Sequence, residues 1–156
     1  MKLKINPEFA MRHLFVTLLM AALCLWFGYD GFVRYPSMQA EDLFELIEGI
    51  PPHDGIDIAA FKQQKIKTQY GFAILALFAT LAVGSNLLKV WLFDFSFDDQ
   101  GFCHNKRRHS YASIREIDRS KWEAKGIIRI NRISLDAWHH LGVKEFVEKL
   151  DSVKPE

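Results

Sequence analysis

Four histidines lie in the C-terminal part of the sequence, and their imidazole nitrogens are the side-chain groups best suited to binding a metal. They are His104, His109, His139 and His140. Zinc sites usually hold three or four close ligands at a recognisable spacing, and neither a CxxC pair nor a paired Cys/His spacing occurs here. We therefore expect no metal and no other cofactor, and we expect these histidines to be exposed or hydrogen-bonded.

Side chains that could act as nucleophiles or acid–base groups show no catalytic pattern. Ser37, Ser110 and Ser113 lack the flanking glycines of a nucleophile elbow. The Asp98-Asp99 pair has no second acidic pair at a spacing suited to acid–base catalysis, and a turn explains it better. The sequence therefore predicts a protein that is not an enzyme.

A basic tripeptide is the first candidate binding site. Lys106, Arg107 and Arg108 follow a long apolar segment and could contact anionic lipid headgroups, where each basic residue contributes about 1 kcal/mol. The alternative, which the sequence favours, is a solvated hairpin whose charges only follow the cytoplasmic bias of Lys and Arg. The whole chain balances 20 Lys and Arg with 19 Asp and Glu, without a long basic block, which argues against nucleic acid as a partner.

A polar cluster inside the second apolar segment is the second candidate. Gly84 and Ser85 are small enough to let another helix approach closely, and Asn86 would need a hydrogen-bond partner within lipid. We expect this cluster to pack against the first helix or another subunit. A transport role has less support because no ionisable residue occupies the middle of either apolar segment.

Two apolar segments must position these groups. Residues 70–93 carry no charge before Lys89, and a helix rising ~1.5 Å per residue would there cross most of a ~30 Å hydrocarbon layer. Residues 14–29 form an apolar run after a basic start, and aromatic residues cluster at its far end as at a membrane interface. A cleaved secretory signal is the alternative for this run. A retained anchor is favoured because Leu23 precedes Cys24 and no small-x-small cleavage site follows.

The placement of Lys and Arg predicts the orientation. Basic residues precede the first span and follow the second, whereas the segment between them is acidic in its first part, so both termini are expected to be cytoplasmic. A lysine group just before the second span counts against this orientation: Lys62, Lys65 and Lys67. The expected organisation is a cytoplasmic N-terminus, a transmembrane helix, an extracytoplasmic helical loop, a second transmembrane helix and a cytoplasmic β domain, at residues 1–13, 14–29, 30–69, 70–93 and 94–156.

The loop between the spans has helical periodicity. Ser37 is a candidate N-cap for a short amphipathic helix that continues to about Glu48. Asp57 can cap a second helix, which would run from Ile58 through Gln69 directly into the second span.

The sequence after the second span changes to strand periodicity. Phe93, Phe95 and Phe97 alternate with polar residues, and Asp99-Gln-Gly101 resembles a hairpin turn. Further strands are predicted at 102–108, 111–122, 127–130 and 133–137, with Tyr111, Ile114 and Ile117 as core candidates of the second. Beyond Gly142, apolar residues at helical spacing predict an amphipathic closing helix: Val143, Phe146, Val147 and Leu150.

Several motifs in residues 94–156 resemble the bacterial pleckstrin-homology-like domains that are attached to membrane helices. They are Phe97-Asp-Asp-Gln-Gly-Phe102, Tyr111-Ala-Ser-Ile-Arg-Glu-Ile-Asp118, Lys121-Trp122, Leu135-Asp-Ala-Trp138 and Gly142-Val-Lys-Glu-Phe146. The resemblance implies binding or scaffolding, supplies no catalytic residues, and places the protein in a bacterial inner membrane. Because the segment is short for a seven-stranded example, we expect a partial barrel or one completed by a partner chain.

Three functions remain open at this point. The first is an α+β membrane protein that serves as a structural or regulatory subunit and binds a protein partner or a second copy of itself. The second is the sensing of anionic lipids or a small ligand by the cytoplasmic domain. The third is a component of an oligomeric transporter, because two helices alone cannot enclose a pore.

Overall fold

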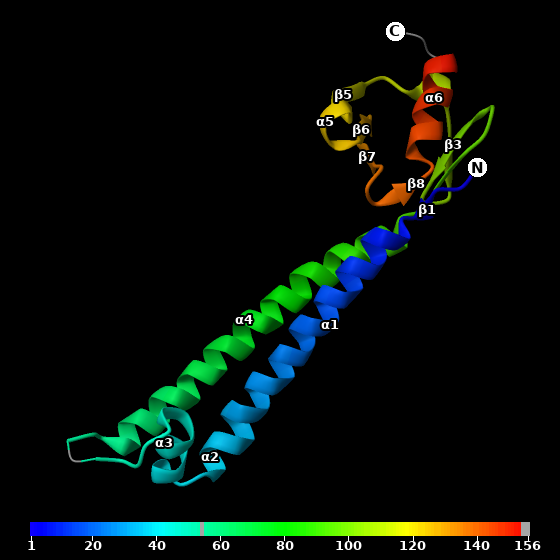
Figure 1. Cartoon of the computed structure of the whole chain (residues 1–156). Helices are drawn as coiled ribbons and strands as arrows, with labels where there is room; N and C mark the ends of the chain where they lie inside the picture. The colour runs from blue at the N-terminus through cyan, green and yellow to red at the C-terminus, as the bar shows by residue number, and fades with distance from the viewer. Residues whose placement is uncertain (54, 154–156) are drawn as a thin grey trace. The chain divides into compact units, whose positions relative to one another are not determined.

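The computed structural model describes residues 1–53 and 55–153, and it contains two long apolar helices and small antiparallel sheets (Figure 1). The expected α+β composition is therefore confirmed. The chain divides into two compact units. The helical unit is Leu14–Ser85, and the β unit combines Met1–His13 with Asn86–Glu156.

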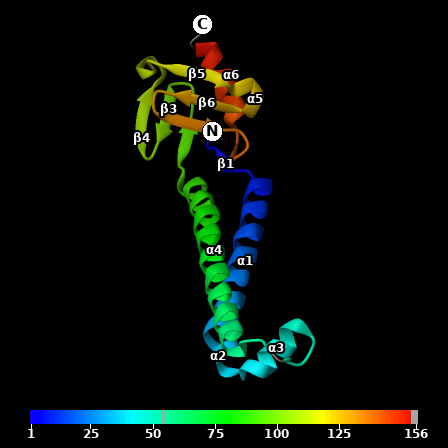
Figure 2. The same cartoon turned by 90° about the vertical axis from the view of Figure 1, so that its left-hand side faces the viewer.

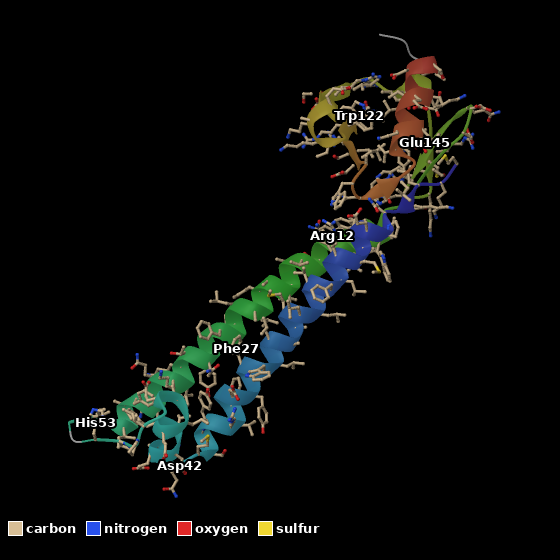
Figure 3. All side chains as sticks on the ribbon, in the orientation of Figure 1. Arg12, Phe27, Asp42, His53, Trp122 and Glu145 are labelled. Carbon is tan, nitrogen blue, oxygen red and sulfur yellow. The ribbon has the colours of Figure 1, made fainter. Side chains whose placement is uncertain are left out.

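Two antiparallel helices form the helical unit: α1 (Pro7–Tyr29) and α4 (Ile58–Leu92). Cys24 on α1 donates a hydrogen bond from its Sγ to the carbonyl of Ala73 on α4 at 3.5 Å. Phe27 of α1 points toward α4, where its ring centroid lies 5.3 Å from that of Phe72 (Figure 3). A Cβ on Gly84 would lie 3.4 Å from Thr17 Cγ2, which is an ordinary van der Waals contact, so Gly84 lies at the contact between the helices.

The apolar side chains of these helices largely face outward. The stretches Pro7–Ser37 and Ile58–Leu92 are each long and apolar enough to cross a membrane. Only 6% and 11% of their most apolar windows are buried, whereas the core helix of a soluble protein would bury most of its apolar surface. The residues predicted to span, 14–29 and 70–93, lie within these helices except for Phe93, which follows the end of α4.

A π-helical turn, Asp30–Arg34, continues α1 into the short helix α2 (Tyr35–Ser37). Asp30 is only 5% exposed and accepts a hydrogen bond from Trp26 Nε1 at 3.0 Å. The prediction that Ser37 caps the following helix is wrong. Ser37 ends α2 and donates to the carbonyl of Arg34, because the chain becomes extended at Met38 before α3 (Ala40–Glu48) begins.

The N-terminal end of α4 matches its prediction. Asp57 Oδ1 accepts a hydrogen bond from the backbone N–H of Ala60 at 2.9 Å, which satisfies one of the free donors of the first turn. The helix then continues without a break from Ile58 to Leu92, as the sequence indicated.

The β unit contains two three-stranded antiparallel sheets, β2-β3-β4 and β5-β6-β7, and the pair β1-β8 (Figure 2). The strands are β1 (Lys4–Ile5), β2 (Phe95–Phe97), β3 (Gly101–His104), β4 (Arg107–Ser110), β5 (Ile117–Lys121), β6 (Ile127–Ile130), β7 (Ile133–Asp136) and β8 (His140–Leu141). A 3-10 turn and two helices complete the unit: η2 (Tyr111–Ser113), α5 (Trp122–Lys125) and α6 (Val143–Val153).

Two strand predictions need correction. The strand predicted at 102–108 is a hairpin, because Asn105 and Lys106 adopt positive φ angles of 49° and 65° and reverse the chain between β3 and β4. The strand predicted at 111–122 begins as the 3-10 turn η2 and forms a ladder only over Ile117–Lys121. Two of its three core candidates, Tyr111 and Ile114, are nevertheless buried, and Ile117 packs at the edge of the core.

One hydrophobic core joins both sheets to α6. The predicted amphipathic helix is confirmed, since all four of its apolar positions are buried. Phe146 lies at its centre, with its ring centroid 5.0 Å from that of Phe95 and 5.1 Å from that of Phe97. Ile128 and Leu135 contribute the side of the second sheet.

The N-terminal residues complete this unit, which the sequence did not indicate. Lys4 and Ile5 of β1 pair with Leu141 and His140 of β8. The backbone N–H of Leu3 donates to the carbonyl of Phe95 at 3.0 Å, and its side chain is 6% exposed within the core. The edges of β2 and β8 are therefore covered by this chain itself.

Replacing Leu3 should test how much this N-terminal segment stabilises the β unit. Leu3→Ala is expected to lower the free energy of unfolding by about 2–4 kcal/mol, because the substitution leaves a cavity in the core. Leu141→Ala is the matched control, since Leu141 sits on the pairing strand but is 48% exposed. Denaturant unfolding of the full chain in detergent, followed by tryptophan fluorescence, would measure both. Equal effects of the two substitutions would contradict the assigned role of Leu3.

Candidate functional site

The basic tripeptide lies at the hairpin between β3 and β4. The backbone N–H of Asn105 donates to the carbonyl of Asp94 at 3.0 Å, which holds the hairpin tip beside the start of β2. Lys106 and Arg107 are exposed, and neither side chain has a hydrogen bond or ion pair among the described residues. These two side chains remain available to an external partner.

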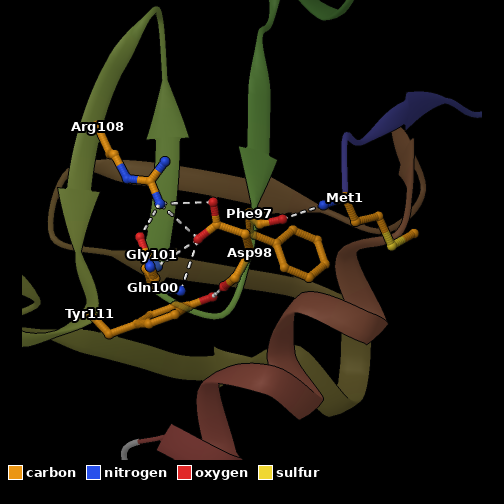
Figure 4. Close-up of polar contacts among 7 residues, drawn as sticks. All are labelled: Met1, Phe97, Asp98, Gln100, Gly101, Arg108 and Tyr111. Carbon is orange, nitrogen blue, oxygen red and sulfur yellow. Dashed lines mark hydrogen bonds and ion pairs between the residues drawn. The ribbon is translucent and has the colours of Figure 1, made fainter.

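Arg108 differs from its two neighbours because Asp98 holds it (Figure 4). Its Nη2 donates to Asp98 Oδ2 at 2.8 Å and to Oδ1 at 3.0 Å, and it reaches Gln100 Oε1 at 3.3 Å. The tripeptide is therefore not one uniform patch. A headgroup that bound Arg108 would have to compete with this carboxylate.

Asp98 organises the turn between β2 and β3. Its Oδ1 accepts the backbone N–H groups of Gln100 and Gly101 at 2.9 and 3.1 Å, and its carbonyl accepts the Tyr111 hydroxyl at 2.8 Å. The bond from Gln100, and then the Arg108 guanidinium, hold the pKa of Asp98 below its usual value. Burial raises the pKa of Tyr111, and the Asp98 carboxylate adds to this effect. The predicted turn at Asp98-Asp99 is thus a network that fixes local structure.

The predicted helix-packing cluster separates into three roles. Gly84 lies against Thr17 of α1. The Ser85 hydroxyl donates to the carbonyl of Ala82 at 3.0 Å on its own helix. Asn86 belongs to the β unit and faces a cavity beside strands β7 and β8. Of the three residues, Gly84 is the one that lies against α1, and packing of the cluster on another subunit stays a prediction.

The cavity beside Asn86 has a volume of about 260 Å³. The last turns of α4 line one side with Asn86, Lys89 and Val90, and Phe93 follows them. Within the described chain, the side chains of Asn86 and Lys89 have no hydrogen bond or ion pair. The α4 wall therefore offers an amide and an ammonium group to an occupant of the cavity.

The opposite wall comes from β7, β8 and the turn between them, and it carries Ser134, Asp136, His139 and His140. Asp136 Oδ1 accepts the backbone N–H of Trp138 at 2.8 Å, and Oδ2 lies 3.6 Å from His139 Nδ1. His140 is buried, with its Nε2 3.4 Å from the Val90 carbonyl, and burial lowers its pKa. His140 is therefore neutral at pH 7, and Asp136 is the anionic group of this wall.

The four histidines considered as metal ligands do not form one cluster, although His104 and His140 both contact the Phe93 ring. His104 lies against the Phe93 ring and His109 stacks on Phe102 in the first sheet, whereas His139 and His140 lie at the cavity. Among residues 1–53 and 55–153, no group of three or more His, Cys, Asp or Glu side chains is placed to hold a metal ion.

A second hollow lies between α5 and α6 and has a volume of about 560 Å³. The half-buried Trp122 supplies apolar surface, the buried Val147 also lines the hollow, and Lys144, Glu148 and Asp151 supply charges. Figure 3 shows Trp122 on α5, and we name this hollow the Trp122 groove. Trp122 was visible in the sequence only as part of a motif, and Lys89 only as the charge ending an apolar run. Neither position signalled a cavity.

The ion pair of Arg108 with Asp98 should make the stability of the β unit depend on pH. The lowered pKa of Asp98 contributes stability that is present above its unfolded pKa and is lost as pH falls through its folded pKa. Arg108→Gln is expected to raise the pKa of Asp98 toward its usual value, so that acid destabilisation begins at a higher pH. Arg107→Gln is the control and should leave this pKa unchanged. NMR titration of the Asp98 carboxyl would measure both, and equal shifts would contradict the assigned pairing.

No family model matches this chain, and neither a curated protein nor a solved structure matches it. The geometry of its own residues is therefore the basis on which a function can be proposed.

Proposed function

We propose that this chain is a two-pass integral membrane protein whose β unit is a cytoplasmic pleckstrin-homology-like module that binds a protein partner. Its role is structural or regulatory and non-enzymatic. The helices anchor the module at the bilayer, and the module supplies the binding surface. A bacterial inner membrane is the location that the sequence resemblance favours.

One observation supports two membrane crossings most strongly: the residues before the first apolar helix and those after the second belong to one compact unit. A chain that enters a bilayer after His13 and re-emerges near Asn86 on the same side must cross an even number of times. The outward-facing apolar side chains of α1 and α4 support two crossings, since lipid would cover them.

Charge supports the cytoplasmic side for the β unit. Basic residues flank both spans within this unit: Lys2, Lys4, Arg12, Lys89, Lys106 and Arg107. Two of them pair with carboxylates: Arg12 pairs with Glu8, and Lys2 lies 2.9 Å from Asp94 and lowers the pKa of that carboxyl. The positive-inside rule counts Lys and Arg rather than net charge, so these pairs do not weaken the assignment.

The arrangement of the β unit supports a pleckstrin-homology-like module. Two antiparallel three-stranded sheets follow one another in the chain and share a core with one closing C-terminal helix. The Trp122 groove supports protein binding, because a tryptophan beside charged side chains is typical of the residues that dominate protein interfaces. A second copy of this chain is the alternative partner.

Lipid sensing by the basic hairpin is the second candidate, and it is favoured by one observation. Lys106 and Arg107 are exposed without ion pairs among the described residues, so they can contact anionic headgroups at no cost in internal pairs. Arg108 contributes less because Asp98 holds it. The transporter hypothesis gains no specific support.

Substitution within α4 tests membrane insertion. Leu81→Arg places a charge near the middle of the apolar span 70–93, where insertion costs about 2.5–3.5 kcal/mol, and is expected to reduce the fraction retained in membranes after alkaline carbonate extraction. Gln63→Arg, in the polar first turns of α4, is the control and should be retained. Complete extraction of the unaltered protein would overturn the proposal.

Thiol labelling gives the orientation for the same proposal. The starting protein is a variant in which both Cys24 and Cys103 are replaced by alanine. Asp42→Cys or Lys125→Cys is then introduced into it as the single cysteine. A membrane-impermeant maleimide should label Asp42→Cys in intact cells and Lys125→Cys only after the membrane is opened. Labelling of both from one side would rule out two crossings.

Photo-crosslinking tests the Trp122 groove. A benzoylphenylalanine in place of Lys144, which lines the groove, is expected to give one discrete adduct in membranes, and Glu148→Lys in the same groove should reduce its yield several-fold. The same probe in place of Arg129, which is exposed on β6, is the control. Adducts of equal yield at both positions would mean that the groove is not the binding surface.

A further inference from the structure

The cavity at the end of α4 combines opposite charges. Lys89 supplies an ammonium group from the helix, and Asp136 supplies a carboxylate from β7. Two further side chains that line it, Asn86 and Ser134, have no hydrogen bond among the described residues and can each donate and accept. Asn86, Lys89 and Ser134 are exposed, so an occupant of the cavity can reach all three, and such converging polar groups suit a polar occupant.

The balance of these charges selects the class of occupant. A simple anion would meet Lys89 but would also be repelled by the Asp136 carboxylate. A simple cation would be repelled by the Lys89 ammonium group. A zwitterion with a phosphate at one end and a primary ammonium at the other matches both charged side chains of the cavity. Its phosphate accepts from Lys89, and its ammonium donates to Asp136.

The surroundings indicate where such a zwitterion comes from. Trp91 and Leu92 in the last turn of α4 are exposed, and so are Trp138 and Leu141 beside the opposite wall. The Arg12 guanidinium lies 5.6 Å from the centre of the Trp138 ring. Exposed tryptophan with nearby Lys and Arg is characteristic of the headgroup level of a bilayer.

We propose that the cavity formed by Asn86, Lys89, Ser134 and Asp136 binds the phosphoethanolamine headgroup of a membrane phospholipid. Lys89 binds the phosphate and Asp136 binds the ammonium, while the acyl chains lie along the exposed apolar surface of α4. The source of the ligand rests on the proposed membrane insertion, whereas the recognition of the headgroup does not.

Native mass spectrometry of the full chain in detergent tests this site with three lipids that carry the same acyl chains. Phosphatidylethanolamine should bind about tenfold more tightly than phosphatidylglycerol, which lacks the ammonium, because one charge-assisted hydrogen bond is lost. Phosphatidylcholine should also bind more weakly, because its quaternary ammonium has no N–H to donate. Equal retention of the three lipids would overturn the proposal without any variant.

Substitutions locate the site. Lys89→Met keeps the apolar stem, and Asp136→Asn keeps the oxygen that accepts from the backbone of Trp138. Each is expected to weaken phosphatidylethanolamine binding about tenfold. Lys125→Met is the control because Lys125 is exposed on α5 and does not line the cavity. Unchanged binding by folded Lys89→Met protein would overturn the assignment, and gel filtration establishes that each variant is folded.

A water-soluble headgroup separates this proposal from that of membrane insertion. Glycerophosphoethanolamine should displace the bound phospholipid from the unaltered protein, whereas glycerophosphate alone should not. Failure of both to compete would show that the acyl chains, and not this cavity, hold the lipid. If carbonate extracted the protein from membranes, the proposal of membrane insertion would be overturned. Binding of glycerophosphoethanolamine to the purified protein would still test the headgroup site independently.

Discussion

The pairing of β1 with β8 is the constraint on which the rest of the structure depends. It joins Lys4 and Ile5 to residues near the C-terminal helix, and Leu3 enters the core beside them. Without this segment, the edge of β2 and the edge of β8 would expose unpaired backbone groups and an apolar gap. The same pairing requires the segments before α1 and after α4 to lie on one side of any membrane that the helices cross.

The polar groups of the β unit divide into those that stabilise the fold and those that remain available for binding. Asp98 and Arg108 satisfy each other and the turn between β2 and β3. Lys89, in contrast, faces a cavity without a partner among the described residues. Because Lys89 is exposed, it can bind an external group without breaking an interaction that stabilises the fold.

Local patterns in the sequence predicted the elements with strong periodicity or local caps. The length of the two apolar runs predicted α1 and α4, and Asp57 marked the start of α4. The spacing of Val143, Phe146 and Leu150 predicted α6. Features that depend on distant partners were not predictable. No local pattern shows that Leu3 meets Phe95, or that Arg108 is held by Asp98 while Arg107 is not. The hairpin at Asn105-Lys106 was missed because it lacks the glycine that usually marks such a turn.

The distance in sequence between β1 and β8 also determines when the β unit can form. β1 is synthesised before either long helix, and its partner β8 follows α4. The first strand therefore stays unpaired until both apolar helices have been synthesised and inserted. Contacts of such large sequence separation slow folding, because the entropy of closing the loop is lost before the contact is gained. Closure of β1 onto β8 would thus be a final step that occurs only in chains whose two helices have already returned to the side from which they started.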